Sequence, residues 1–193
     1  MIAEHPTKKW SIEEFHRLGE TEPWAKHCEL IEGDLIRKMP EGNLHVYLVN
    51  ILIQWLRQTF GYEYVRQEDP LRYQDDRNEE SEPQPDATVL KFHLSAYLDE
   101  NPGGDDVLFV AEVSESTLQD DLVRNAALYA RADFPEYWVL DISGRQIYVH
   151  REPREGRYTS LEIYGQEQTV SLLSKPEIHV EVKTLFPPET ELV

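Results

Sequence analysis

The sequence lacks the features that would place a protein in an oxidising compartment or a membrane. It contains one cysteine, Cys28, so no internal disulfide can form and a reducing cytoplasm is the expected location. No apolar run is long enough to cross a bilayer, and residues 1–6 lack the basic and apolar regions of a signal peptide. There is no repeat and no Gly/Ser-rich linker, so residues 1–193 are expected to form one domain.

Positive charge is also scarce. The chain has 19 Lys and Arg residues against 37 Asp and Glu residues, which gives a formal net charge of −18. Affinity for nucleic acid is dominated by neutralisation of phosphates, so this balance opposes non-specific attraction to DNA or RNA. No membrane partner is expected either.

The familiar motifs of hydrolases and metal sites are missing. The sequence has no H-E-x-x-H, CxxC or GxSxG pattern and no phosphate-cradling glycine loop. The histidines show no metal-ligand spacing, and His45, at the start of an apolar helix, is by itself typical of a core or capping histidine. The acidic stretch over residues 75–82 is typical of a solvated loop.

The chain does contain enough apolar residues for a folded core, since 40% of all its residues are hydrophobic. A capping box of Ser11 and Glu14 predicts the start of a first helix. We expect helices over residues 11–18, 45–60 and 117–132, a hairpin over 28–36, an exposed loop over 74–86, and strands over 87–92, 107–113, 136–141, 146–150, 158–164 and 178–185. This order predicts an α+β fold with a mixed sheet flanked by helices, an N-terminal hairpin and additional C-terminal strands.

Two carboxylates interrupt β-like apolar runs. Glu112 lies in a segment of apolar residues that is typical of a buried strand, where an ionised carboxylate costs several kcal/mol unless a cation or several donors compensate. Asp86 opens the preceding strand and, taken alone, is equally typical of a turn residue after Pro85. If the two strands are neighbours, the pair forms a candidate site for a divalent metal. Alternation places Glu112 on the face of Val110 and Ser114.

Two further polar residues are candidates. Steps of 100° place Asn125 in the middle of an inward stripe of the helix over residues 117–132, four residues after Asp121. It is either a core asparagine bonded to a backbone carbonyl or a residue aimed at the pocket of Glu112, whereas Arg124 more naturally faces outward. Glu29, in the first arm of the hairpin, is most simply explained by an exposed face.

Taken together, these residues resemble a known family. The segments 28–35 (CELIEGDL), 111–117 (AEVSEST) and 127–141 (ALYARADFPEYWVLD), with His45, Pro85, Asp86 and Asp121, are similar to the Uma-two family. This large bacterial family of restriction-endonuclease-like proteins belongs to the PD-(D/E)XK nuclease superfamily. The resemblance extends over residues 10–186 and is most specific over residues 112–141.

The resemblance implies a restriction-endonuclease-like fold in which Asp86 and Glu112 ligate Mg²⁺, with Mn²⁺ as a second option. The backbone carbonyl of Val113 is implied as a third ligand, Glu29 as an additional acidic member, and His45 as the histidine that the family has at this helix start. Such an oxygen site keeps metal-bound waters, one of which could attack a phosphodiester of DNA. Nucleases of the superfamily often act as homodimers.

One departure from the family pattern bears on activity. Members commonly carry a lysine four residues after the aspartate that matches Asp121, where this chain has Asn125. The lysine is thought to orient the attacking water and to stabilise negative charge. Its loss is expected to cost on the order of 10²–10³ in rate.

Three functions therefore stay open. The first is a weak, Mg²⁺-dependent DNA endonuclease. The second is an inactive nuclease-fold protein that binds protein or nucleic acid, which Asn125 and the charge of −18 favour. The third is a metal-dependent hydrolase of a substrate smaller than duplex DNA.

Overall fold

A six-stranded mixed sheet forms the centre of the computed structural model, which describes residues 8–38, 40, 42–75 and 78–188. Its strands run in the order β10-β9-β8-β7-β6-β3, and only the β7–β8 pair is parallel. Their bounds are β3 Val65–Arg66, β6 Ala87–Leu90, β7 Val107–Ser114, β8 Glu136–Asp141, β9 Gln146–Arg154 and β10 Arg157–Gly165. The expected α+β fold with a mixed sheet is confirmed.

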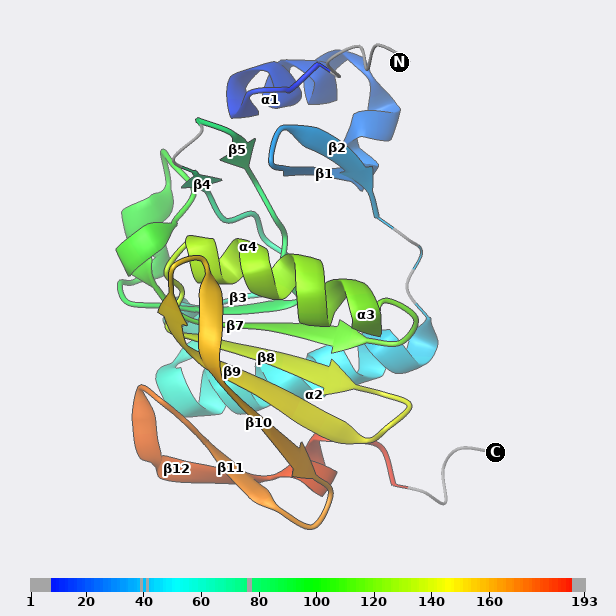
Figure 1. Cartoon of the computed structure of the whole chain (residues 1–193), viewed down its shortest axis with the longest axis vertical. Helices are drawn as coiled ribbons and strands as arrows, with labels where there is room; N and C mark the ends of the chain where they lie inside the picture. Colours follow the sequence, from blue (N-terminus) through cyan, green and yellow to red (C-terminus); the bar gives the residue numbers. More distant parts are fainter. Residues whose placement is uncertain (1–7, 39, 41, 76–77, 189–193) are drawn as a thin grey trace.

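Helices cover both faces of this sheet, as Figure 1 shows. Helix α2 (Asn43–Phe60) packs on the face that carries Ala111 and Val113 of β7. Helices α3 (Leu118–Asp120) and α4 (Ala126–Arg131) lie over the opposite face, where Val110 belongs to a second core cluster. Successive residues of a strand point to opposite faces, so Glu112 faces α3 and α4 together with Val110.

The apolar stripe of α2 is placed as predicted. Val49, Leu52 and Leu56 are buried, whereas Asn50 and Gln54 are exposed on the other side of the helix. The helix begins two residues earlier than expected, at Asn43. Gly42 precedes it and offers no side-chain cap, so no capping residue marks the start of this helix.

The predicted continuous helix over residues 117–132 is wrong in its middle. A π-helical turn, η5 (Asp121–Asn125), separates α3 from α4. Thr117 stands at the N-cap position but makes no capping hydrogen bond, because its hydroxyl instead donates to Asp121 at 2.7 Å. A π turn inserts an extra residue per turn, so the 100° steps used for the sequence prediction do not hold across it.

The N-terminal segment forms a separate layer above the sheet (Figure 1). The first helix, α1, is capped by Ser11 and Glu14 as predicted, but it ends at Thr21 rather than at residue 18. The predicted hairpin is confirmed, with a tight turn in which Gly33 has a φ of 76°. The elements of this layer are α1 Ile12–Thr21, the 3-10 helix η1 Pro23–His27, β1 Cys28–Ile31 and β2 Asp34–Arg37.

Residues 74–86 do not form the exposed loop that was predicted. The short strands β4 (Tyr73–Gln74) and β5 (Glu80–Ser81) pair with each other, and Glu82 forms a bridge to Leu30 of β1. Asp75, Ser81 and Glu82 are buried, so the acidic run is not simply solvated. Residues 76 and 77 of this segment, like residues 1–6, lie outside the described part of the chain.

The C-terminal ribbon also differs from the prediction. Strand β11 (Thr169–Leu172) was not foreseen, and it pairs with β12 (Lys175–Glu181). The expected strand over residues 178–185 ends at Glu181, because a 3-10 helix, η6 (Val182–Leu185), buries Val182 and Leu185 three residues apart.

The remaining 3-10 helices are η2 Tyr62–Tyr64, η3 Leu94–Tyr97 and η4 Gly104–Asp106. Among the described residues, no helix combines the length and hydropathy needed to cross a bilayer.

A buried histidine makes the stability of this fold depend on pH. His150 of β9 stacks on Tyr137 and packs at a tilted angle against Tyr158, and its Nε2 has no hydrogen-bond partner among the described residues. Burial lowers its pKa from 6.5 to about 4. The unfolded chain therefore binds a proton more readily between these values, and stability is lost as the pH falls through this window.

We therefore predict that His150→Phe flattens the pH dependence of stability. At pH 5, 1.5 units below the ordinary pKa of 6.5, wild type should have lost about 2 kcal/mol more of its pH 7 unfolding free energy than the variant. Urea denaturation of both proteins at pH 7 and pH 5 measures this difference. Parallel pH dependences would show that His150 is not buried as a neutral side chain.

Candidate active site

Two carboxylates face each other across the β6–β7 pair. The strands are antiparallel neighbours with Ala87 opposite Ala111, so Asp86 lies opposite Glu112. Oε2 of Glu112 accepts a hydrogen bond from the backbone N–H of Asp86 at 3.3 Å. Oδ2 of Asp86 accepts one from the backbone N–H of Val113 at 2.6 Å. Each carboxylate is thus held by the backbone of the other strand.

Glu112 lies in an environment that disfavours its charge. Burial raises the pKa of its carboxyl well above the ordinary value, and the charges of Asp86, Asp121 and Glu29 raise it further. The hydroxyl of Tyr129 donates to Oε1 of Glu112 at 2.7 Å and opposes this rise by stabilising the ionised form. In the absence of a cation, the environment therefore favours the protonated form of Glu112 more than water does.

His45 and Glu29 approach the same place from other elements. Nε2 of His45, in the first turn of α2, lies 3.3 Å from Oδ1 of Asp86. Oε1 of Glu29, on β1, accepts a hydrogen bond from the backbone N–H of Gln84 at 2.8 Å. Burial raises the pKa of Glu29, whereas the nearby charge of Lys38 lowers it. Glu29 is therefore not on an exposed hairpin face, which was its simplest explanation.

The π turn η5 contributes Asp121 and Asn125 to the same region. Asp121 is buried and accepts hydrogen bonds from the hydroxyls of Ser114 and Thr117 and from Nδ2 of Asn125, the last at 2.8 Å. Asn125 is thus bonded to a side chain one turn away rather than to a backbone carbonyl. Arg124 is exposed, as predicted, and its Nη2 lies 3.8 Å from Asp120.

These residues line one cleft of about 240 Å³ between the sheet, the N-terminal hairpin and the π turn. Its walls include all of the residues singled out from the sequence: Glu29, His45, Asp86, Glu112, Val113 and Asn125. Sequence reasoning did not identify Lys38 and did not include Tyr129, Ser114 or Asp121 among the site residues. The sequence contained a signal for two of these residues. Ser114 lies on the same strand face as Glu112, and Tyr129 lies on the same predicted helix stripe as Asn125.

The cleft fits a hard divalent cation by the chemistry of its donors. Carboxylate oxygens of Asp86 and Glu112 and a backbone carbonyl are the ligands that Mg²⁺ and Mn²⁺ prefer. The N–H of Val113 points to Asp86, and in an extended strand the carbonyl of the same residue faces the same neighbouring strand. A bound cation would also remove the electrostatic cost of placing Glu112 beside Asp86 and Asp121.

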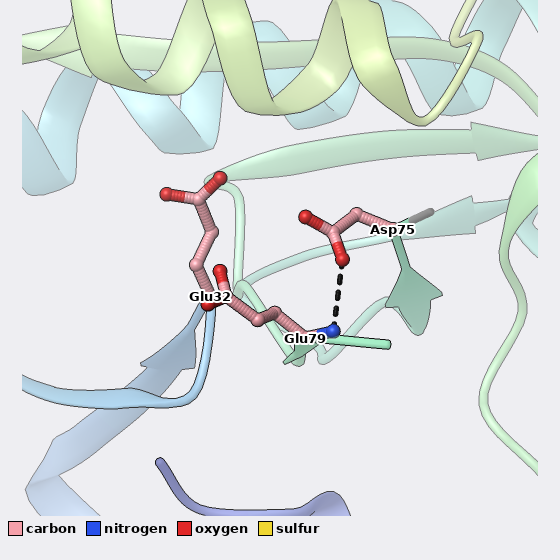
Figure 2. Close-up of side chains that lie close together, drawn as sticks. All are labelled: Glu32, Asp75 and Glu79. Atoms are coloured by element: carbon pink, nitrogen blue, oxygen red, sulfur yellow. Dashed lines mark hydrogen bonds between the residues drawn. The ribbon is translucent and has the colours of Figure 1, made fainter. Parts of the chain in front are cut away.

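A second group of carboxylates lies outside this cleft (Figure 2). Within the described part of the chain, Glu32, Asp75 and Glu79 are the one trio of possible ligand side chains whose oxygens all lie within 4.8 Å of one another. Positive groups already accompany it, because Nη2 of Arg131 lies 2.6 Å from Oε1 of Glu32 and Nζ of Lys9 donates to the backbone carbonyl of Glu32 at 2.8 Å. The trio thus contributes to the contact between the N-terminal layer and α4.

The contact of Tyr129 with Glu112 gives a test of the electrostatics of the cleft. We predict that Tyr129→Phe raises the pKa of Glu112 further, because the variant loses a donor to the ionised carboxylate. Side-chain carbon NMR of metal-free protein measures this titration. Tyr158→Phe is the matched control, since its hydroxyl donates to the carbonyl of Phe134 instead. Equal pKa values of Glu112 in the two variants would contradict the assigned hydrogen bond.

Comparison with known proteins agrees with this fold. A model of the Uma2 family, described as "Putative restriction endonuclease", matches residues 12–183. Among solved structures, the chain is similar to an Anabaena variabilis protein described as a "putative nuclease belonging to DUF820", with 21% identity and a TM-score of 0.66. The similarity covers 94% of this chain and 98% of that one and concerns the fold. No curated protein matches. Because the family model spans most of its length, this chain belongs to the Uma2 (Uma-two) family of restriction-endonuclease-like proteins.

Proposed function

We propose that this protein is a Mg²⁺-dependent endonuclease that hydrolyses phosphodiester bonds of DNA in the cytoplasm. The observation that carries the proposal is the pairing of Asp86 and Glu112, each hydrogen-bonded to the backbone of the other strand and open to one cleft. Membership of a family described as restriction endonucleases supports the reaction class. The free, buried Cys28 is consistent with a reducing compartment.

In this proposal Asp86, Glu112 and the carbonyl of Val113 hold the cation. When bound, Mg²⁺ or Mn²⁺ supplies charge neutralisation at the phosphate and lowers the pKa of a water. Val113 and His45 fix the carboxylate of Asp86, and Tyr129 fixes that of Glu112. Because these partners hold both carboxylates before substrate arrives, little reorganisation is needed during the reaction.

The proposal predicts the effect of removing either carboxylate. Asp86→Asn and Glu112→Gln should each reduce Mg²⁺-dependent cleavage of plasmid DNA by on the order of 10²–10³ and weaken Mg²⁺ binding measured by calorimetry. Glu79→Gln is the control, because Glu79 belongs to the second carboxylate group. Single-stranded DNA and RNA are assayed in parallel to define the substrate. If Glu79→Gln alone abolished metal binding, the cation would belong to the other group.

A non-catalytic binding protein is the second candidate, and one observation favours it. Nδ2 of Asn125 donates to Asp121, so the position that the family fills with lysine is occupied here by a neutral side chain engaged inside the protein.

A homodimer, the arrangement expected from the superfamily, would present two clefts to the two strands of a duplex. Sedimentation of the purified protein measures the oligomeric state.

Restoring the lysine separates the two candidates. Asn125→Lys places an ammonium among Asp121, Asp86 and Glu112, and it should raise metal-dependent cleavage at least about tenfold above wild type. Adding Glu112→Gln should abolish the gain. Asn50→Lys is the control, because it adds the same charge on the exposed side of α2. A folded Asn125→Lys protein that binds Mg²⁺ but gains no activity would favour the non-catalytic candidate.

A further inference from the structure

The scarce positive charges of this chain are not evenly spread. A groove of about 730 Å³ lies beside the cleft and is lined by Lys26, His27, Arg37 and Lys38, and among its described lining residues Glu68 is the one that is acidic. Over the whole chain there are about two acidic residues for each basic one, 37 against 19. The groove is thus a region of local positive charge on an acidic protein.

The hairpin brings these cations together from two segments. Lys26 and His27 end the 3-10 helix η1 that leads into β1, and Arg37 ends β2. Arg37 pairs with Cys28 across the hairpin, and the backbone N–H of Lys38 donates to the carbonyl of His27 at 2.8 Å. Backbone pairing therefore holds the two basic segments side by side at the open end of the hairpin.

Their charges are available to a ligand. Lys26, Arg37 and Lys38 form no ion pair with any residue in the described ranges, and Lys26 and Arg37 are exposed. By contrast, Lys9, Arg131 and Arg151 are each paired with a carboxylate. Within the described ranges, a contact with an anion would not require Lys26, Arg37 or Lys38 to break an ion pair.

The groove is continuous with the cleft. Arg37, Lys38 and Gln84 line both cavities, and Lys38 lies close enough to Glu29 for its charge to lower the pKa of that carboxyl. A ligand that follows the basic residues is therefore led to Asp86 and Glu112. The basic side chains of the groove could contact several phosphates of one strand. The carboxylates of the cleft could then hold a metal ion at a further phosphate of the same strand.

We propose that this basic groove binds the sugar-phosphate backbone of the nucleic-acid substrate and guides it into the cleft, with Lys38 at the junction. The inference rests on the proposed function, because it assigns the substrate path to the same site. The net charge of −18 opposes attraction of nucleic acid from a distance, but charges more than about 8 Å from the groove are largely screened at physiological salt. Local charge at the groove then decides contact with phosphate.

Binding without cleavage tests the groove separately from catalysis. A fluorescein-labelled 20-nucleotide strand and the matching duplex are titrated by anisotropy with Ca²⁺ in place of Mg²⁺, and gels verify that the probes stay intact. The double variant Lys26→Gln/Arg37→Gln is compared with Lys91→Gln/Arg157→Gln, which removes the same charge from residues outside both cavities. Urea denaturation verifies that both variants are folded.

The groove variant should bind at least about tenfold more weakly than wild type at low salt. The slope of log affinity against log salt should fall by about 2, which corresponds to two lost phosphate contacts. The control variant should stay within about twofold of wild type. The strand and duplex arms show which form of nucleic acid the groove prefers, and polyglutamate of matched charge should not compete.

Other outcomes would overturn the inference. Equal losses in the two double variants would show that only overall charge matters, and equal competition by polyglutamate would indicate a surface for acidic proteins. Unchanged binding by the groove variant, with cleavage still abolished by Glu112→Gln, would reject the groove while leaving the proposed nuclease intact. Absence of nucleic-acid binding by wild type would reject both.

Discussion

The cost of placing two carboxylates side by side at a sheet governs the architecture of this site. Asp86 and Glu112 would repel each other and lose solvation, and hydrogen-bond donors offset part of this cost, while the pKa of Glu112 stays raised. Backbone N–H groups of Val113 and Asp86 and the hydroxyl of Tyr129 supply these donors. The register of β6 on β7 is therefore a functional constraint as well as a structural one.

The main elements could be predicted because their apolar patterns are long. The buried run of β7, the stripe of α2 and the capping box of α1 each combine several concordant residues. The π turn could not be predicted, because no residue type specifies an inserted residue in a helix. Burial of Asp75 and Glu82 was equally hidden, since it arises from contacts with the N-terminal layer rather than from local sequence.

The candidate site likewise contains residues that could be predicted from the sequence and residues that could not. The carboxylates were recognisable because they interrupt apolar strands, and family resemblance added His45 and Glu29. Lys38 was not recognisable, because a single lysine between a strand and a helix has no pattern that marks it. Only the pairing of the hairpin ends shows that Lys38 and Lys26 belong to one groove and that this groove opens into the cleft.

The cleft is built from two layers, which are joined by apolar packing of Ile31 of β1 in the core cluster of Tyr129 and by polar contacts. Arg131 reaches Glu32 from α4, and His16 of α1 meets Glu82. A ligand that touches both the hairpin and the sheet would add its own binding energy to these contacts. By linkage, docking of the layers and occupancy of the cleft by such a ligand would then reinforce each other to the same extent.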